Sequence, residues 1–512
     1  MSWFRLGCTG LTLVVFVFVA ACTASETVTQ TQTRLRSVEN YRTVDVQAMA
    51  NLLKEYRRSD EDEVLYEMES GMLHHFRGNW EESAGHFQQA DRAIERHYTK
   101  DISKNLKSFL VNDLQLPYTG EPYESIYLTT FNCLNYLHMG DMQGALVEMR
   151  RINHKLELLN DRYRGIAQSL MKRDTALTAV KKAEEKLEGV QLLSKDGGAP
   201  EIRQNSALGR FLTTVLYGKT GAPDDAHIEL QKLRTALEDQ GQLRFLSSLA
   251  QASSSERESD NDAIPSTWAQ EEWTASDVLS SLFEMQYTMS GEPAGPTTSP
   301  EAKPAAVSIP RPSQLTQGRH YNTLLLAFTG QAPIKEERAF HIPIPVNDEI
   351  VQLHFAVPIL KSPESRVEQV RVLAAGDTVS VPMVENMQRV AHEMFDQRKP
   401  IVYTRAVVRA FLKMGATEGA QKLAKDELGD TAGFLAKHAG NLMSSQAAQA
   451  DTRGWQTMPG HAHALVAQLP KGEQTVTFEY LSDRGHVLKR RTRTVTVRGR
   501  NDLALAESIY LK

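Results

Sequence analysis

The first half of the chain repeats one pattern of small and bulky apolar residues three times. When Val64 is counted as position 1, positions 8, 15, 20, 24 and 27 are Gly71, Gly78, Ser83, Phe87 and Ala90. The same positions counted from Ile126 are Cys133, Gly140, Ala145, Met149 and Ile152. Counted from Ala207, they are Thr214, Gly221, Ala226, Leu230 and Leu233. Apolar residues at this spacing predict amphipathic helices, here in three successive pairs.

The individual positions have physical roles in such a pair. Small residues at positions 8 and 20 let two antiparallel helices approach closely, and the glycine at 15 can end the first helix with a positive φ. This spacing resembles the tetratricopeptide repeat, a helix-turn-helix unit of about 34 residues. The starts of the three units are 62 and 81 residues apart, so they do not form a continuous array. Three unrelated helical hairpins are the alternative interpretation.

The resemblance also implies a concave groove lined by the first helix of each unit. The residues at the groove positions are mostly apolar, which argues against a clamp for a peptide carboxylate; those assigned as a tentative binding surface are Met72, Phe76, Tyr127, Phe131, Leu134, Phe211 and Val215. Monomeric proteins rarely expose so large an apolar patch. Either the chain itself or an apolar partner segment must therefore fill the groove. We expect the chain to fill it with helices that lie between the repeats.

The second half of the chain alternates between strand and helix signals. Strand-like segments run from His320 to Ala375, and two helices are expected at 384–398 and 400–423. Strands return between Ala462 and Gly499, with a hairpin over "SDRG". The sequence thus predicts an α+β multidomain protein with all-α repeats at 41–250, a partly disordered linker at 251–317 and an antiparallel β domain with a helical insertion at 318–512.

The N-terminus has the features of a secretory signal. One arginine precedes a short apolar run, which is followed by Val19-Ala20-Ala21-Cys22. That tetrapeptide resembles the lipobox of bacterial lipoproteins. The resemblance implies cleavage of residues 1–21, acylation of Cys22 with fatty acids such as palmitate, and a flexible lipidated tether over 22–40. Because Thr23 replaces the aspartate typical of inner-membrane retention, the resemblance implies the periplasmic face of the outer membrane.

A second resemblance extends over most of the chain. The segments from Pro117 to Asn153, "YTRAVVRAFLK" (403–413) and "DTRGWQTMP" (451–459) look like one family of uncharacterised bacterial outer-membrane lipoproteins with tetratricopeptide-like repeats. The resemblance supplies no catalytic residues. Members of that family are linked by gene context to activators of cell-wall synthesis, so the resemblance points only weakly to such a role.

Charge and composition exclude several functional classes. The formal net charge of −5 gives no basic excess for nucleic acid binding. Phosphate-binding loops of the GxxxxGKS kind, GxSxG elbows and HExxH motifs are absent from the sequence. No catalytic residue, metal site or cofactor is therefore assigned, and the protein is not expected to be an enzyme.

Three short motifs have both a binding and a structural interpretation. His461 and His463 could hold zinc on one face of a strand, but the other ligands are not evident. Asp451 to Trp455 could bind a ligand, although an internal Asp–Arg pair with a packed Trp455 is favoured. The basic run from Lys489 to Arg493 could contact an anionic polymer, or it could protect the edge of a sheet.

Together these features predict a lipid-anchored scaffold or adaptor that faces the periplasm and binds envelope proteins through its helical repeats. The alternatives are a regulatory subunit that activates a cell-wall synthase or supports a secretion or appendage machine, and an enzyme with an unfamiliar site. The sequence predicts membrane attachment through the lipid on Cys22, because no later apolar run is long enough to span a bilayer.

Replacing Cys22 tests the lipobox directly. The Cys22→Ser variant should accumulate as an uncleaved precursor or lose its acylation, because only a cysteine thiol can accept the diacylglyceryl group. Metabolic labelling with a fatty acid, followed by electrophoresis, measures both outcomes. Maturation and acylation equal to those of the wild type would contradict the assignment.

Overall fold

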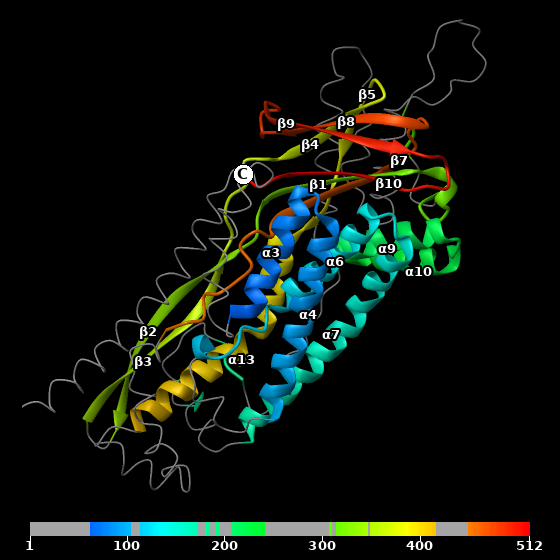
Figure 1. Cartoon of the computed structure of the whole chain (residues 1–512). Helices are drawn as coiled ribbons and strands as arrows, with labels where there is room; N and C mark the ends of the chain where they lie inside the picture. The colour runs from blue at the N-terminus through cyan, green and yellow to red at the C-terminus, as the bar shows by residue number, and fades with distance from the viewer. Residues whose placement is uncertain are drawn as a thin grey trace, which may run out of the picture.

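The computed structural model describes residues 62–103, 113–172, 180–181, 183, 191–193, 206–240, 307–309, 314–346, 349–415 and 449–512. The predicted signal peptide, the tether with Cys22 and most of the predicted linker lie outside these residues. The described part of the chain combines helices in its first half with β-sheets in its second half, an α+β architecture (Figure 1).

The predicted helix pairs are present as three hairpins. The first pairs α3 (Glu63–Arg77) with α4 (Trp80–Ser103), and the second pairs α6 (Pro122–His138) with α7 (Met142–Met171). The third pairs α9 (Ala207–Thr220) with α10 (Pro223–Asp239). A short 3-10 helix, η3 (Asp113–Gln115), precedes α6.

The three glycines predicted to end the first helices have the expected conformation. Gly78, Gly140 and Gly221 follow α3, α6 and α9 with φ angles of 84°, 79° and 77°. The predicted close approach is confirmed in the first hairpin. A Cβ atom on Gly71 would lie 2.6 Å from the ring of Phe87, and Ser83 Oγ donates a 2.7 Å hydrogen bond to the Gly71 carbonyl.

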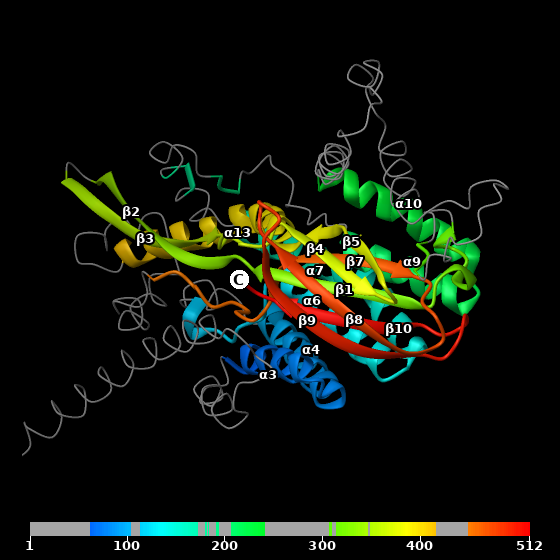
Figure 2. The same cartoon turned by 90° about the horizontal axis from the view of Figure 1, so that it is seen from above.

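The strands form two four-stranded sheets and a separate two-stranded ribbon. The first sheet has the order β10 (Ala504–Tyr510), β1 (Thr323–Gln331), β7 (Pro459–Ala467) and β6 (Met383–Asn386). The second has the order β5 (Asp377–Val381), β4 (Gln369–Ala374), β8 (Gly472–Leu481) and β9 (Val487–Val497). The ribbon consists of β2 (Ile334–Val346) and β3 (Glu349–Lys361), and it extends away from the sheets beside a long helix, α13 (Met387–Gly415) (Figure 2). A 3-10 turn, η6 (Gly318–His320), leads into β1.

Two details differ from the sequence prediction. The pairing of β1 with β10 is parallel, whereas the other ladders are antiparallel as expected, including the predicted β8–β9 hairpin. The two helices predicted at 384–398 and 400–423 are replaced by the single helix α13, which contains Pro400 and follows β6. Proline removes one backbone donor and its ring clashes with the carbonyl four residues earlier, and packing of α13 against β3 and the helical hairpins can outweigh that cost.

Strand β1 is buried on both faces and connects the layers of the fold. Leu324, Leu326 and Phe328 belong to the core that the sheet shares with the helices. Leu325 and Ala327 point the other way, into the core between the two sheets. The helices, the first sheet and the second sheet therefore form three successive layers (Figure 1).

This arrangement fills the predicted groove. All seven residues assigned to it are buried, namely Met72, Phe76, Tyr127, Phe131, Leu134, Phe211 and Val215. The ring of Phe131 lies 5.0 Å from that of Phe328 on β1 and 6.2 Å from that of Trp455. These residues are core in the folded chain, so they offer no open surface to a partner. The aromatic contacts with Phe131 come from the second half of the chain. Much of the chain between the repeats, which we expected to cover the groove, lies outside the described residues.

Gly140 provides a test of the turn geometry. The Gly140→Val variant should lower the free energy of unfolding by about 1 kcal/mol or more, because a β-branched residue is strained at positive φ. Denaturant titration measures the change. The matched control is Gly165→Val, since Gly165 lies within helix α7 with open space around its Cα. Equal effects at the two sites would show that the strain at Gly140 is not responsible.

Candidate functional site

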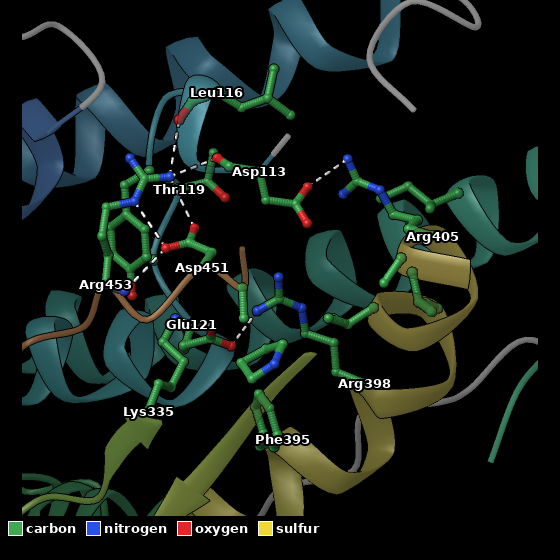
Figure 3. A pocket seen from close by; sticks show the side chains of 18 of the residues that line it. Asp113, Leu116, Thr119, Glu121, Lys335, Phe395, Arg398, Arg405, Asp451 and Arg453 are labelled. Atoms are coloured by element: carbon green, nitrogen blue, oxygen red, sulfur yellow. Dashed lines mark hydrogen bonds and ion pairs between the residues drawn. The ribbon is translucent and has the colours of Figure 1, made fainter. Parts of the chain in front are cut away.

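A cavity of about 80 Å³ lies where helix α13, the β2–β3 ribbon, the loop before α6 and the segment from Gln449 to Arg453 meet (Figure 3). Nine of the residues that line it carry a formal charge. The basic ones are Arg162, Lys335, Arg398, Arg405, Arg409 and Arg453, and the acidic ones are Asp113, Glu121 and Asp451. We refer to it as the arginine-lined cavity.

Regular secondary structure places most of these side chains. Arg398, Arg405 and Arg409 are spaced by seven and four residues on α13, which puts all three on one face of the helix. Lys335 lies on β2. The loop that carries Glu121 ends in a capping box at the start of α6. In it, the side chains of Glu121 and Glu124 each accept a hydrogen bond from the backbone N–H of the other residue.

Glu121 holds two of the cations. One carboxylate oxygen of Glu121 accepts a 2.8 Å hydrogen bond from Lys335 Nζ, and the other oxygen forms an ion pair with Arg398. Burial alone would raise the pKa of Glu121, but Arg398 and Lys335 hold it below its usual value. Glu121 is therefore ionised and fixes the positions of both cations.

Asp113 does the same for two arginines further along α13. Its carboxylate oxygens lie 3.0 Å from Arg405 Nη2 and 3.1 Å from Arg409 Nη2. Burial would raise the pKa of Asp113, yet the two guanidinium groups outweigh that effect and lower it. The ion pairs link the loop before α6 to α13 across the cavity (Figure 3).

Arg453 occupies the opposite wall. It contacts Asp451 at 2.9 Å and Asp62 at 3.2 Å, and its Nη2 donates to the carbonyls of Asp113 and Leu116 at 2.8 and 3.0 Å. The neighbouring Trp455 is only 3% exposed and packs against the rings of Phe87 and Phe131. The predicted internal Asp–Arg pair beside a packed tryptophan is thus confirmed.

The chemistry of this cavity suits binding rather than proton transfer. The pKa values of all three lining carboxyls, Asp113, Glu121 and Asp451, are lowered by adjacent cations although burial alone would raise them. A general acid or base works best with a pKa near the operating pH. The cavity instead presents fixed positive charge and N–H donors.

Buried glutamates join the helical hairpins to the second half of the chain. Glu69 on α3 accepts hydrogen bonds from the backbone N–H groups of Gln456 and Thr457 at 2.6 and 3.2 Å, and Glu124 on α6 accepts one from Trp455 N at 2.8 Å. Burial raises the pKa of Glu69 to about 7, although these hydrogen bonds lower it in part.

Glu385 and Glu507 make equivalent connections from the sheet. Glu385 on β6 accepts from Ser206 Oγ and Leu208 N at the start of α9, at 2.9 and 3.1 Å. The carboxylate thus lies at a helix N-terminus, where negative charge is favoured. Burial nevertheless raises its pKa to about 7.

Glu507 on β10 binds two histidines. Its oxygens lie 2.8 Å from His75 Nε2 and 2.7 Å from His138 Nε2, and Trp80 stacks on His138 with ring centroids 3.7 Å apart. Burial would lower the pKa of His75, but Glu507 reverses the effect and raises it. A second cavity, of about 210 Å³, lies beside this cluster.

The other residues that the sequence suggested as binding candidates, the two histidines and the basic run, lie on strands. His461 and His463 lie on β7, where burial lowers their pKa values to about 4 and about 3, so both are neutral at pH 7. Within the described ranges no group of three His, Cys, Asp or Glu side chains could hold a metal ion. The basic run Lys489–Arg493 lies on β9, at the edge of its sheet.

Sequence reasoning identified the segments of the arginine-lined cavity but not the cavity itself. The three segments on which the lipoprotein resemblance rests contribute Glu121, Arg405, Arg409 and Arg453 to its lining. The spacing of arginines on α13 was a further visible signal. Comparisons of the chain with protein-family models, with curated proteins and with solved structures find no match.

The raised pKa of Glu69 predicts a pH dependence of stability. A carboxyl whose folded-state pKa exceeds its unfolded value stabilises the fold below the unfolded pKa, and this contribution is lost as pH rises toward about 7. The Glu69→Gln variant should therefore lose less stability than the wild type between pH 5 and pH 8, by on the order of 1–3 kcal/mol. Denaturant unfolding at the two pH values measures this difference.

The control is Glu473→Gln, because Glu473 is exposed on β8. This variant should keep the pH dependence of the wild type. If Glu69→Gln also keeps it, Glu69 does not carry the predicted titration.

Proposed function

We propose that the protein is a lipid-anchored scaffold or adaptor on the periplasmic face of a bacterial outer membrane, where it binds other envelope proteins. Cys22 supplies the anchor, and the three helical hairpins are tetratricopeptide-like units. The glycines of positive φ after α3, α6 and α9 support this assignment of the hairpins. Within the part of the chain that the structure describes, no helix has the length and apolar character of a membrane span.

The exposed apolar residues on the second helices of two hairpins carry this proposal. The inner face of the hairpins is covered by β1, β10 and the segment around Trp455, so a partner must contact another face. Large apolar side chains remain exposed on α7 and α10, with Val147 53%, Leu158 52% and Ile228 52% exposed. These three side chains are the candidate contacts for a partner. The outer helical surface is therefore the proposed partner site.

Site-specific photocrosslinking tests this surface. A photoreactive amino acid at position 147, 158 or 228 in the full-length protein should give discrete adducts with an envelope protein in native membranes. The same amino acid at Leu373, which is 36% exposed on β4, is the control and should give none. Absence of adducts from all three helical positions, or the same adducts from Leu373, would contradict a partner site on the helices.

A further inference from the structure

We propose that the arginine-lined cavity is a binding site for a phosphate-sized oxyanion, either free phosphate or the phosphoryl group of a larger molecule. This inference does not depend on the adaptor function, because it concerns a cavity between α13 and the segment ending at Arg453, away from the outer helical surface. It rests on an unsatisfied buried donor, the balance of charge, the arrangement of the arginines and the space available.

Arg409 supplies the unsatisfied donor. Its side chain lies in the cavity wall and is only 4% exposed. One nitrogen, Nη2, contacts Asp113, but the buried Nε has no hydrogen-bond partner among the residues that the structure describes. A buried donor of a charged group without an acceptor is costly, so such a group calls for an explanation. An oxyanion in the cavity would provide the acceptor.

The charge of the lining favours an anion. Six basic side chains face three acidic ones. Among the described residues, Asp62 and Glu124 add carboxylates from outside the lining, beside Arg453 and Lys335 respectively. Glu337, at the rim, accepts a hydrogen bond from the backbone N–H of Ala450. Because Glu337 is exposed to solvent, its negative charge is more strongly screened than the buried charges. Cations outnumber carboxylates in the lining, and this favours an anionic ligand.

The arginines are also held in place before any ligand arrives. Arg398 and Arg405 reach the cavity from α13, and Arg453 reaches it from the opposite wall (Figure 3). Each is fixed by a carboxylate: Glu121, Asp113 and Asp451 respectively. Guanidinium groups bind phosphate oxygens through paired N–H donors, and fixed donors lose little entropy on binding.

The size of the cavity limits the ligand. A volume of about 80 Å³ holds several water molecules or one group the size of phosphate or sulfate. A nucleotide or a peptide would not fit inside it. The cavity therefore suits a phosphoryl group alone, with any remainder of the molecule outside.

Calorimetric titration of the full-length protein in detergent tests the proposal. Inorganic phosphate should bind and raise the melting temperature, because a ligand of the folded state stabilises it, whereas acetate should bind at least about tenfold more weakly. Glycerol 3-phosphate distinguishes the sources. Binding as tight as that of phosphate indicates a phosphoryl group on a larger molecule, and much weaker binding indicates the free ion. Failure of all three to bind at millimolar concentration would overturn the proposal.

Two variants with opposite expected effects on phosphate affinity test whether the ion binds in this cavity. Arg409→Gln removes the unsatisfied donor and one charge, so it should weaken phosphate binding at least about tenfold. Asp113→Asn removes an anion that competes for Arg405 and Arg409, while the amide oxygen can still accept a hydrogen bond from them and keep them in place, so it should tighten phosphate binding even if it lowers stability. The control, Arg490→Gln, changes an exposed arginine on β9 that pairs with Glu479, and it should leave binding unchanged.

The direction of the Asp113→Asn effect separates a ligand site from a purely structural network. If phosphate binds the wild type but Asp113→Asn does not tighten it, the bound ion lies elsewhere and the proposal is wrong. The same conclusion follows if Arg490→Gln weakens binding as much as Arg409→Gln does. Should Arg409→Gln fail to fold, Asp113→Asn and the wild type still decide the question.

Discussion

The fold depends on covering the apolar inner face of the helical hairpins with the first β-sheet. Phe131, at the centre of that face, packs against Phe328 of β1 and against Trp455. Buried apolar area is the main favourable term in folding, but it does not by itself fix how two surfaces are aligned. The glutamates that cross the same boundary supply directional contacts: Glu69 to the backbone at Gln456, Glu385 to the start of α9, and Glu507 to His75 and His138. The hairpins and the sheets are consequently parts of one packed body.

Much of the fold was visible in the sequence because its determinants are local. Amphipathic spacing marked the helices, and glycine at position 15 of each unit marked the turns. The covering of the groove was harder to predict because it is a contact between segments more than a hundred residues apart. A signal was nevertheless present. The strand "TLLLAFTG" is a continuous apolar run, typical of a strand buried on both faces, and such a strand requires a second covering layer. The single helix α13 was missed because Pro400 is usually a boundary signal, and tertiary packing outweighed it.

The arginine-lined cavity illustrates the same limit for the candidate site. The positions of Arg398, Arg405 and Arg409 on one helical face follow from their spacing alone. Their partners do not, since Glu121 lies 277 residues before Arg398 and Asp113 lies 296 residues before Arg409. These acids lie beside α13 in a fold where α6 and α7 pack against that helix. Ion pairs add little to stability where solvent screens them, and burial of unmatched charge is costly. The network is therefore better explained by the need to hold several cations close together than by a need for stability.

Two groups of buried carboxylates in this protein differ electrostatically, one at the boundary between helices and sheets and one around the arginine-lined cavity. Within the described residues, Glu69 and Glu385 have hydrogen-bond donors but no ion-pair partner, and burial raises their pKa values to about 7. Protonation near neutral pH costs them little, so the boundary between helices and sheets can adjust its charge. Asp113, Glu121 and Asp451 are paired with arginine or lysine, and their pKa values are lowered. They stay ionised throughout the neutral range, and the guanidinium groups that they hold keep the same positions. A site whose charge and geometry are both insensitive to pH near neutrality suits the binding of a permanently charged ligand, and it is poorly suited to moving protons.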